Sequence, residues 1–340
     1  MKLPQLFVLL VALVCPALES AAAVKKIVFI AGKPSHGPLQ HEHRAGSLLL
    51  QKCLADFPGI ITQVYDNGWP TITKNGQTVD NNAAFEGADA IIIYSDGGGG
   101  HPTLQGERLQ LLERLTKSGV GLGLIHYAVE PTLAKGQKEF LDWVGGAFEI
   151  NLSVNPHWTA DFKTLPVHAV TRGVNPFSSN DEWYFNLRFR DGMRGVTPIL
   201  TAVPPASTMS RPDGAHSGNP AAREAVAKGT PQTVMWVSER NDGGRGFGFT
   251  GGHYHMGWKN DDQRRVVLNA ILWLANIDVP AGGVVSKVTD QDMNANLDAK
   301  TAKGPIVAST EPAPEIVPPE ILAVPEGFEV TVWARSPLLN

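Results

Sequence analysis

The sequence predicts an α/β protein with a doubly wound, mostly parallel sheet. Nearly continuous apolar runs, which are typical of strands buried on both faces, alternate with amphipathic helical segments. Several runs lead directly into glycine-rich turns with polar side chains, and open α/β folds bind their ligands at that edge of the sheet. The chain has 340 residues, of which 43% are hydrophobic and 18% charged, so it can bury a sizeable core.

The hydrophobic pattern places the sheet strands and the helices between them. Strands are expected near residues 26–32, 60–65, 89–94, 120–125 and 246–250. Right-handed crossovers between parallel strands should put helices on both faces of the sheet. From residue 136 to 229 the alternation stops, and we interpret this segment as an elaboration of the carboxyl edge. A turn signal at 241–244 predicts a hairpin that ends in the last strand.

The first 23 residues are typical of a secretory signal. Lys2 precedes an apolar run at 6–18, and small residues follow at 20–23. The run is too short for stable membrane insertion, so the protein is expected to be secreted or periplasmic. Cys53 would then be the remaining cysteine, and an intramolecular disulfide is excluded.

The rest of the chain is expected to have three parts. The α/β domain should cover residues 24–280. A proline-rich linker at 281–323 should pack little against it, because few of its side chains are apolar. Apolar alternation at 324–340 suits a further strand.

Histidines follow four of the predicted strands, at positions 36, 101, 126 and 253. Because the carboxyl ends of parallel strands meet at one edge, these side chains are expected to line one pocket. His253 and His255 share a face if the turn is extended. A divalent metal, zinc foremost, is therefore considered. Its expected ligands are His36, His41, His253 and His255.

Carboxylates near these turns extend the predicted site. Glu42 and Asp96 precede helices and are expected to cap them, whereas Glu130 and Glu182 have no such local role. A histidine–carboxylate pair suits general acid–base chemistry, and paired carboxylates suit glycosidic bond cleavage. The predicted catalytic residues are His126, Glu130, Glu182 and His253. The predicted substrate contacts are His36, Asp96, Gly99, His101, Tyr127 and Trp258.

Two ligand classes are not expected. A formal net charge of −4 leaves no basic footprint for nucleic acid. The tetraglycine at 97–100 lacks the lysine and Ser/Thr of a phosphate-binding P-loop, which argues against a nucleotide.

Six sequence blocks resemble the trehalose-utilisation (ThuA-like) family over roughly residues 24–280. They are Ser35-His36-Gly37 with His41-Glu42, Ser95-Asp96-Gly97 with His101-Pro102, Gly123-Leu124-Ile125-His126, the stretch 168–173, Asp181-Glu182-Trp183-Tyr184, and Gly252-His253 with 269–273. The resemblance implies a class I glutamine amidotransferase-like, flavodoxin-like fold and a role in carbohydrate metabolism. His126-Tyr127 stands where an amidotransferase needs its cysteine, so cysteine-dependent amide hydrolysis is excluded.

A second resemblance lies at the end of the chain. Residues 324–340 are similar to the opening strand of propeller domains in secreted sugar-dehydrogenase-like proteins. This implies a fused or downstream dehydrogenase-like domain as a partner.

The sequence therefore predicts a secreted hydrolase or lyase that acts on a small-molecule carbohydrate, either a sugar or an oxidised sugar. The alternative is a non-catalytic carbohydrate-binding module that grips hydroxyls through histidines and tryptophans. An enzyme needs perturbed acid–base groups in a pocket that excludes water, whereas a module would present a shallow aromatic platform. In either case the flat face of Trp258 is expected to stack on a sugar ring.

Overall fold

Five of the predicted apolar runs form adjacent parallel strands. The structure is a computed structural model that describes residues 23–301, and within that range the main sheet has seven strands in the order β11-β12-β13-β6-β5-β1-β2. The parallel strands are β1 (Lys25–Ala31), β2 (Ile60–Tyr65), β5 (Ala88–Tyr94), β6 (Gly121–Ile125) and β13 (Arg245–Phe249). The predicted mostly parallel α/β sheet is confirmed.

The other two strands extend the sheet with antiparallel pairing. The strand β12 (Gln232–Glu239) pairs with β13 through the predicted hairpin, and β11 (Val196–Ala202) pairs with β12 at the edge. The buried residues of β11 are Val196, Ile199, Leu200 and Ala202, and its pairing register with β12 shifts on both sides of Leu200. The carboxyl ends of β1, β5, β6 and β13 consequently share one edge.

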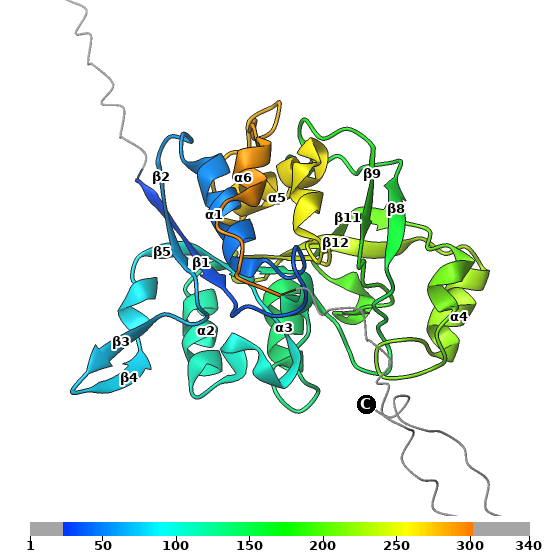
Figure 1. Cartoon of the computed structure of the whole chain (residues 1–340), viewed down its shortest axis with the longest axis horizontal. Helices are drawn as coiled ribbons and strands as arrows, with labels where there is room; N and C mark the ends of the chain where they lie inside the picture. The colour runs from blue at the N-terminus through cyan, green and yellow to red at the C-terminus, as the bar shows by residue number, and fades with distance from the viewer. Residues whose placement is uncertain (1–22, 302–340) are drawn as a thin grey trace, which may run out of the picture. The chain divides into compact units, whose positions relative to one another are not determined.

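Helices cover both faces of the sheet, as predicted. In Figure 1, α1 (His43–Leu54) and α5 (Asp261–Leu274) lie above the sheet, and α2 (Arg108–Lys117) and α3 (Gln137–Val144) lie below it. Each pair closes its own apolar cluster against the strands. Gly46 lets α1 approach β5 closely, because a Cβ there would lie 2.5 Å from the ring of Tyr94. The doubly wound arrangement is confirmed.

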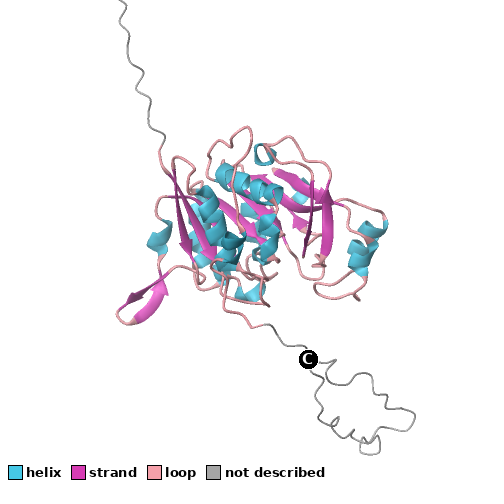
Figure 2. Cartoon of the chain, turned by 45° about the horizontal axis from the view of Figure 1, so that its top comes forward, coloured by secondary structure: helices cyan, strands magenta, loops and turns pink. Residues whose placement is uncertain are grey.

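The segment between residues 136 and 229 adds small elements beside the sheet, as Figure 2 shows for the pair of strands near α4. These elements are β7 (Gly146–Ala147), β8 (Trp158–Phe162), β9 (Phe177–Asp181), β10 (Arg188–Phe189) and α4 (Pro220–Ala227). A separate hairpin, β3 (Thr71–Lys74) with β4 (Gln77–Asp80), follows β2. The antiparallel pair β8–β9 ends at Asp181, next to the predicted site residue Glu182.

Residues 281–300 pack on the domain, which corrects the expectation of a loose linker starting after Pro280. The short helix α6 (Asp290–Asn294) is capped by Thr289, and its Met293 side chain is fully buried. Lys300 Nζ donates a hydrogen bond to the carbonyl oxygen of His41 at 3.2 Å. The composition misled because two buried apolar side chains nine residues apart, Val284 and Met293, give no periodic signal among polar residues.

The predictions for the chain ends lie outside the described residues. These are the signal segment up to residue 22, the linker from residue 302 and the strand at 324–340. Within the described part, no helix is both long and apolar enough to span a bilayer.

Met293 gives a direct test of the corrected domain boundary. Met293→Ala should lower the free energy of unfolding by about 2–5 kcal/mol, because it leaves a cavity where α6 packs. Met256→Ala is the matched control, since that side chain is 39% exposed and its loss should cost little. Urea unfolding of the two variants, followed by circular dichroism, measures the difference. Equal urea midpoints for the two variants would indicate that the domain ends near Pro280, as the sequence predicted.

Candidate metal centre

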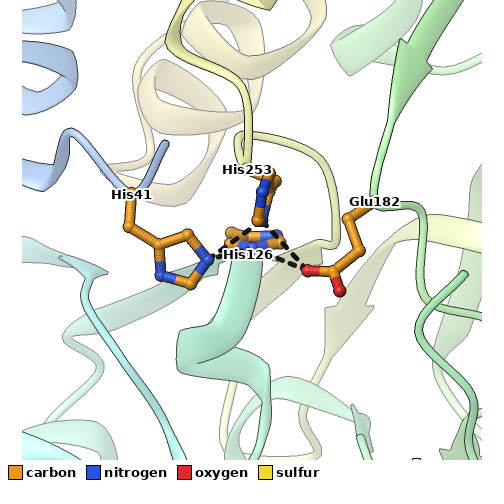
Figure 3. Close-up of side chains that lie close together, drawn as sticks. All are labelled: His41, His126, Glu182 and His253. Carbon is orange, nitrogen blue, oxygen red and sulfur yellow. Dashed lines mark hydrogen bonds and ion pairs between the residues drawn. The ribbon is translucent and has the colours of Figure 1, made fainter. Parts of the chain in front are cut away.

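Three histidines and one glutamate converge at the carboxyl edge of the sheet. One nitrogen or oxygen atom from each side chain lies within 4.8 Å of the corresponding atoms of the other three. Figure 3 shows the four side chains pointing toward one another from different parts of the fold. They are His41, His126, Glu182 and His253.

The distances within this cluster are short. His41 Nε2 lies 3.0 Å from His253 Nδ1 and 3.1 Å from His126 Nε2. Glu182 Oε2 lies 3.1 Å from His253 Nδ1 and 3.5 Å from His126 Nε2. Four ligands at about 2.0–2.1 Å from a tetrahedral zinc ion are spaced about 3.3 Å apart, so the cluster has the dimensions of a zinc site.

Each of the four side chains comes from a loop at the end of a strand. His41 ends the loop between β1 and α1, His126 directly follows β6, and His253 lies in the turn after β13. Glu182 follows β9, outside the main sheet. The site therefore uses the edge at which open α/β folds bind ligands, and it is completed by the added β8–β9 pair.

Several site histidines have backbone conformations that are unfavourable for residues other than glycine. The φ angles are 59° at His36, 46° at His41 and 57° at His126. Such left-handed backbone costs roughly 1–2 kcal/mol per residue, and non-glycine examples concentrate at functional sites. At His126 the left-handed turn comes directly after β6 and aims the imidazole across the sheet edge.

A buried carboxylate fixes the turn that carries His253. Asp181 accepts hydrogen bonds from the backbone N–H groups of Gly252 at 2.7 Å and His253 at 3.0 Å. Burial raises the pKa of Asp181 to about 6, while the backbone donors act in the opposite direction. Gly252 has φ of 103°, which suits glycine, so the sequence and the carboxylate together determine this turn.

Hydrogen bonds outside the cluster determine which nitrogen of two histidines carries the proton. His41 Nδ1 lies 2.6 Å from Asp96 Oδ1, and His126 Nδ1 lies 2.8 Å from the carbonyl oxygen of Thr250. Both partners are acceptors, so Nδ1 is the donor in each ring and Nε2 keeps its lone pair. The two lone pairs then face each other at 3.1 Å, an arrangement that suits a bound cation.

The electrostatic environment keeps these imidazoles neutral. Burial lowers the pKa of His41 and of His126 well below the ordinary value, and neighbouring histidines lower both further. Burial raises the pKa of Glu182, but the hydrogen bond from His253 and the nearby histidine charges lower it overall. Neutral imidazoles and an ionised carboxylate are the forms that bind a metal.

His253 is held less firmly than the other two histidines. Its Nε2 atom is buried and has no hydrogen-bond partner among residues 23–301. The hydroxyl of Tyr184 completes the inner arrangement, at 3.3 Å from Glu182 Oε2 and 3.2 Å from His126 Nε2. The residues present therefore fit one divalent ion with three nitrogen ligands and one oxygen ligand.

The cluster is bordered by more exposed groups. The ring of His36 stacks on that of His41 with centroids 3.5 Å apart, and the ring of Tyr127 lies 6.2 Å from the same histidine. His157 Nε2 lies 3.7 Å from Glu182 Oε1 on another side. These exposed and half-buried side chains form the approach to the buried centre.

A cleft of about 710 Å³ begins beside the cluster at Ser95 and Asp96. Its walls come from the loop after β1, the β3–β4 hairpin and the loop that contains Gly99 and Gly100. Asp96 thus contacts both the cleft and His41. Ligand pockets have volumes of about 300–1,000 Å³, so the cleft is large enough for a small molecule.

Three predicted site residues lie elsewhere. His101 Nε2 bonds to the carbonyl oxygen of Ala128 and its ring is fully buried, so it is a structural residue. His255 Nε2 bonds to the carbonyl oxygen of Met293 and does not join the cluster. Trp258 is completely buried, so it is not available to stack on a sugar. In each case burial or a hydrogen bond to the backbone keeps the side chain out of the cluster.

The carboxylates also differ in part from expectation. Glu42 occupies the N-cap position of α1, but its side chain makes no capping hydrogen bond, and Asp96 does not cap a helix. Glu42 accepts hydrogen bonds from the backbone of Leu39 and Asp298, and Asp96 bonds to His41. Glu130 lies outside the four-residue cluster.

Several residues that contribute to the site were not predicted from the sequence. Asp181 and Tyr184 occur in the recognised 181–184 block, but their contacts depend on how β9 packs against the sheet. Asn155 Nδ2 donates to Glu182 Oε1 at 3.0 Å from a loop with no recognisable motif. A search for polar residues around the tryptophan-rich 136–229 segment would have included all three.

Comparisons with known proteins agree with this fold. The family model described as trehalose utilisation, ThuA, matches residues 41–274. A solved ThuA-like protein from Bacteroides uniformis ATCC 8492 has a TM-score of 0.51 and 15% identity, covering 76% of this chain and 95% of that one. Another from Parabacteroides merdae ATCC 43184 has a TM-score of 0.46 and 14% identity, covering 79% and 94%. A comparison with curated proteins found no match.

The fold and the site loops define a flavodoxin-like α/β protein with a histidine-rich centre at the carboxyl edge of its sheet. The chain belongs to the trehalose-utilisation (ThuA) family, because the family model spans more than half of its length.

Asp181 tests how the site turn is held. Asp181→Ala should lower the free energy of unfolding by roughly 3 kcal/mol or more, because it leaves buried N–H groups without acceptors. Asp161→Ala is the control, since within the described part of the chain that exposed carboxylate on β8 contacts only Ser178 and Lys163. Urea unfolding at pH 7 compares the two. Equal stabilities would show that the turn is held without the carboxylate.

Proposed function

We propose that this protein is a carbohydrate-processing enzyme, a hydrolase or lyase acting on a sugar or oxidised sugar, with a divalent metal, zinc foremost, at its centre. His41, His126, His253 and Glu182 would hold the metal. Export through the sequence-predicted signal segment is part of the same proposal. The family assignment supports the link to carbohydrate use.

One observation carries the metal assignment. The lone pairs of His41 Nε2 and His126 Nε2 face each other at 3.1 Å, because both Nδ1 protons are committed to acceptors outside the cluster. A shared proton would satisfy this pair alone, whereas a divalent ion satisfies all four inward-facing atoms. Three protein nitrogens and one oxygen at tetrahedral spacing are typical of zinc.

The enzyme is favoured over the binding module by the distribution of aromatic and titratable groups. Every tryptophan among residues 23–301 is at most 5% exposed, so that part of the chain offers no tryptophan platform for a sugar ring. The titratable groups of the cluster are instead buried, and burial shifts the pKa of His41 and His126. Such shifts are characteristic of catalytic sites.

The neighbouring cleft supports a small polar substrate. Asn67, Thr71 and Gln105 line it, and amide and hydroxyl groups suit sugar hydroxyls. A substrate in the cleft would reach the centre past Asp96, with its reacting atoms at the end nearest His41.

The chain's own groups have distinct expected roles. A bound zinc ion would supply Lewis acidity toward a carbonyl or water oxygen, which would have to join the four protein ligands or replace one of them. Asp96 orients His41, and the Thr250 carbonyl orients His126. Tyr184 donates to Glu182, and it is close enough to hold or move a proton beside the substrate.

Metal content tests the proposal through two neighbouring histidines. His253→Ala should reduce the bound zinc by at least tenfold, because it removes a first ligand. His255→Ala is the matched control: it lies two residues away, bonds to Met293 and should retain zinc. Elemental analysis of the purified proteins after dialysis provides the measurement. Equal metal content in both variants, or none in the wild type, would contradict the assignment.

Turnover tests the chemical class. The wild-type protein should act on at least one member of a panel of oxidised and unoxidised disaccharides, lose activity with a chelator and regain it with Zn²⁺. His253→Ala should lose turnover while keeping its circular dichroism spectrum. Binding to a panel member without turnover would favour the carbohydrate-binding module instead.

Asp96 tests the outer hydrogen bond to His41. Asp96→Asn should weaken zinc affinity by about 10–100-fold, because the imidazole loses its charged partner. Asp89→Asn is the control, since that carboxylate pairs with Lys25 at the opposite end of the sheet. Competition with a chromophoric chelator measures the affinities. An unchanged zinc affinity in Asp96→Asn would show that Asp96 does not orient His41 for metal binding.

A further inference from the structure

A second histidine–carboxylate pair lies beside the proposed metal centre. His216 Nε2 is 3.0 Å from Glu130 Oε1, and the two side chains are 34% and 2% exposed, respectively. Glu130 follows the turn after β6, whereas His216 comes from the loop before α4. Neither belongs to the four-residue cluster.

Two short chains of contacts connect this pair to the centre. Asn155 donates its backbone N–H to the carbonyl oxygen of His216 at 3.0 Å, and its side chain donates to Glu182 Oε1 at 3.0 Å. The ring of Phe148 stacks on His216 and also contacts Tyr184, with centroid distances of 5.2 and 5.4 Å. His216 is therefore connected to Glu182 through Asn155 and to Tyr184 through Phe148, without being a ligand.

The imidazole of His216 is held on one side and free on the other. Glu130 accepts a hydrogen bond from the Nε2–H group, and the ring of Phe148 stacks on one face of the imidazole. Among residues 23–301, His216 Nδ1 has no hydrogen-bond partner. A histidine fixed through one nitrogen by a buried carboxylate, with its other nitrogen open, has the arrangement of a catalytic acid or base.

We propose that His216 donates a proton through Nδ1 to the departing oxygen of the substrate, with Glu130 as its positioning residue. This inference rests on the proposed function, because it concerns the bond that the same site would break. In this proposal the metal ligands and the proton donor are different residues of the protein.

For a hydrolysis, the step balances as follows. The oxygen of a water molecule bonds to the sugar carbon, and the carbon–oxygen bond to the leaving group breaks with its electron pair on the departing oxygen. His216 gives its Nδ1 proton to that oxygen and becomes neutral. The attacking water gives a proton to a base at the metal centre, so no further reactant is needed.

The charges around His216 suit a proton donor. The hydrogen bond to Glu130 raises its pKa, and the charges of Glu130 and Glu182 also raise it, while burial and Arg211 lower it. A raised pKa means that the imidazolium form is present below that pKa and is lost as the pH rises through it. Turnover that depends on this proton should therefore decline on the alkaline side.

Leaving-group dependence tests the proposal. His216→Gln should lower turnover of a glycoside with a sugar leaving group by about 10²–10⁴-fold. A 4-nitrophenyl glycoside of the same sugar, whose leaving group needs no proton, should lose less than about tenfold. Zinc content should be unchanged. Glu130→Gln should show a smaller loss of the same kind and shift the alkaline limb to lower pH. Asp213→Asn, on the same loop and paired with Arg223, is the control.

The outcomes separate this inference from the proposed function. Equal loss on both substrates, or loss of zinc in His216→Gln, would overturn the role of His216 as proton donor. If the wild type turned over no carbohydrate, the proposed function would fail. The interaction between His216 and Glu130 could then be tested without turnover, by nuclear magnetic resonance titration. The pKa of His216 should exceed 6.5 and should fall in Glu130→Gln. A pKa at or below 6.5 would overturn the pair.

Discussion

The site depends on one buried carboxylate, that of Asp181, which accepts hydrogen bonds from backbone N–H groups. Asp181 ends β9, and the groups that it binds belong to the turn after β13. It therefore joins the added β8–β9 pair to the main sheet at the point where His253 enters the centre. The next residue, Glu182, supplies the oxygen atom of the cluster. Two successive residues thus perform a structural and a chemical task.

Parallel strands explain why the other site residues meet. Strands β1, β5, β6 and β13 all end at one edge, so the loops that follow them deliver His41, Asp96, His126 and His253 to one region. Burial then lowers the pKa of His41 and of His126 and keeps both imidazoles neutral, and outer hydrogen bonds orient them. The sheet topology brings these side chains together, whereas burial and hydrogen bonds determine their protonation and orientation.

The sequence was sufficient for the sheet and for part of the site. Apolar runs and turn signals placed the parallel strands, because buried strands have a strong local pattern. The positions of His126 and His253 after strands indicated their common edge. His101 follows a strand equally well, yet its ring turns to the carbonyl oxygen of Ala128. His41 reaches the centre through a left-handed backbone, and neither event has a local sequence signal.

The three left-handed histidines also bear on how this chain can change over time. At roughly 1–2 kcal/mol each, their backbone strain is a sizeable fraction of the 5–15 kcal/mol by which a folded domain is stable. Glycine or asparagine at these positions would relieve that strain, so a lineage released from its chemistry would drift toward them. Histidine at 36, 41 and 126 therefore lowers the stability of the fold relative to glycine at the same positions.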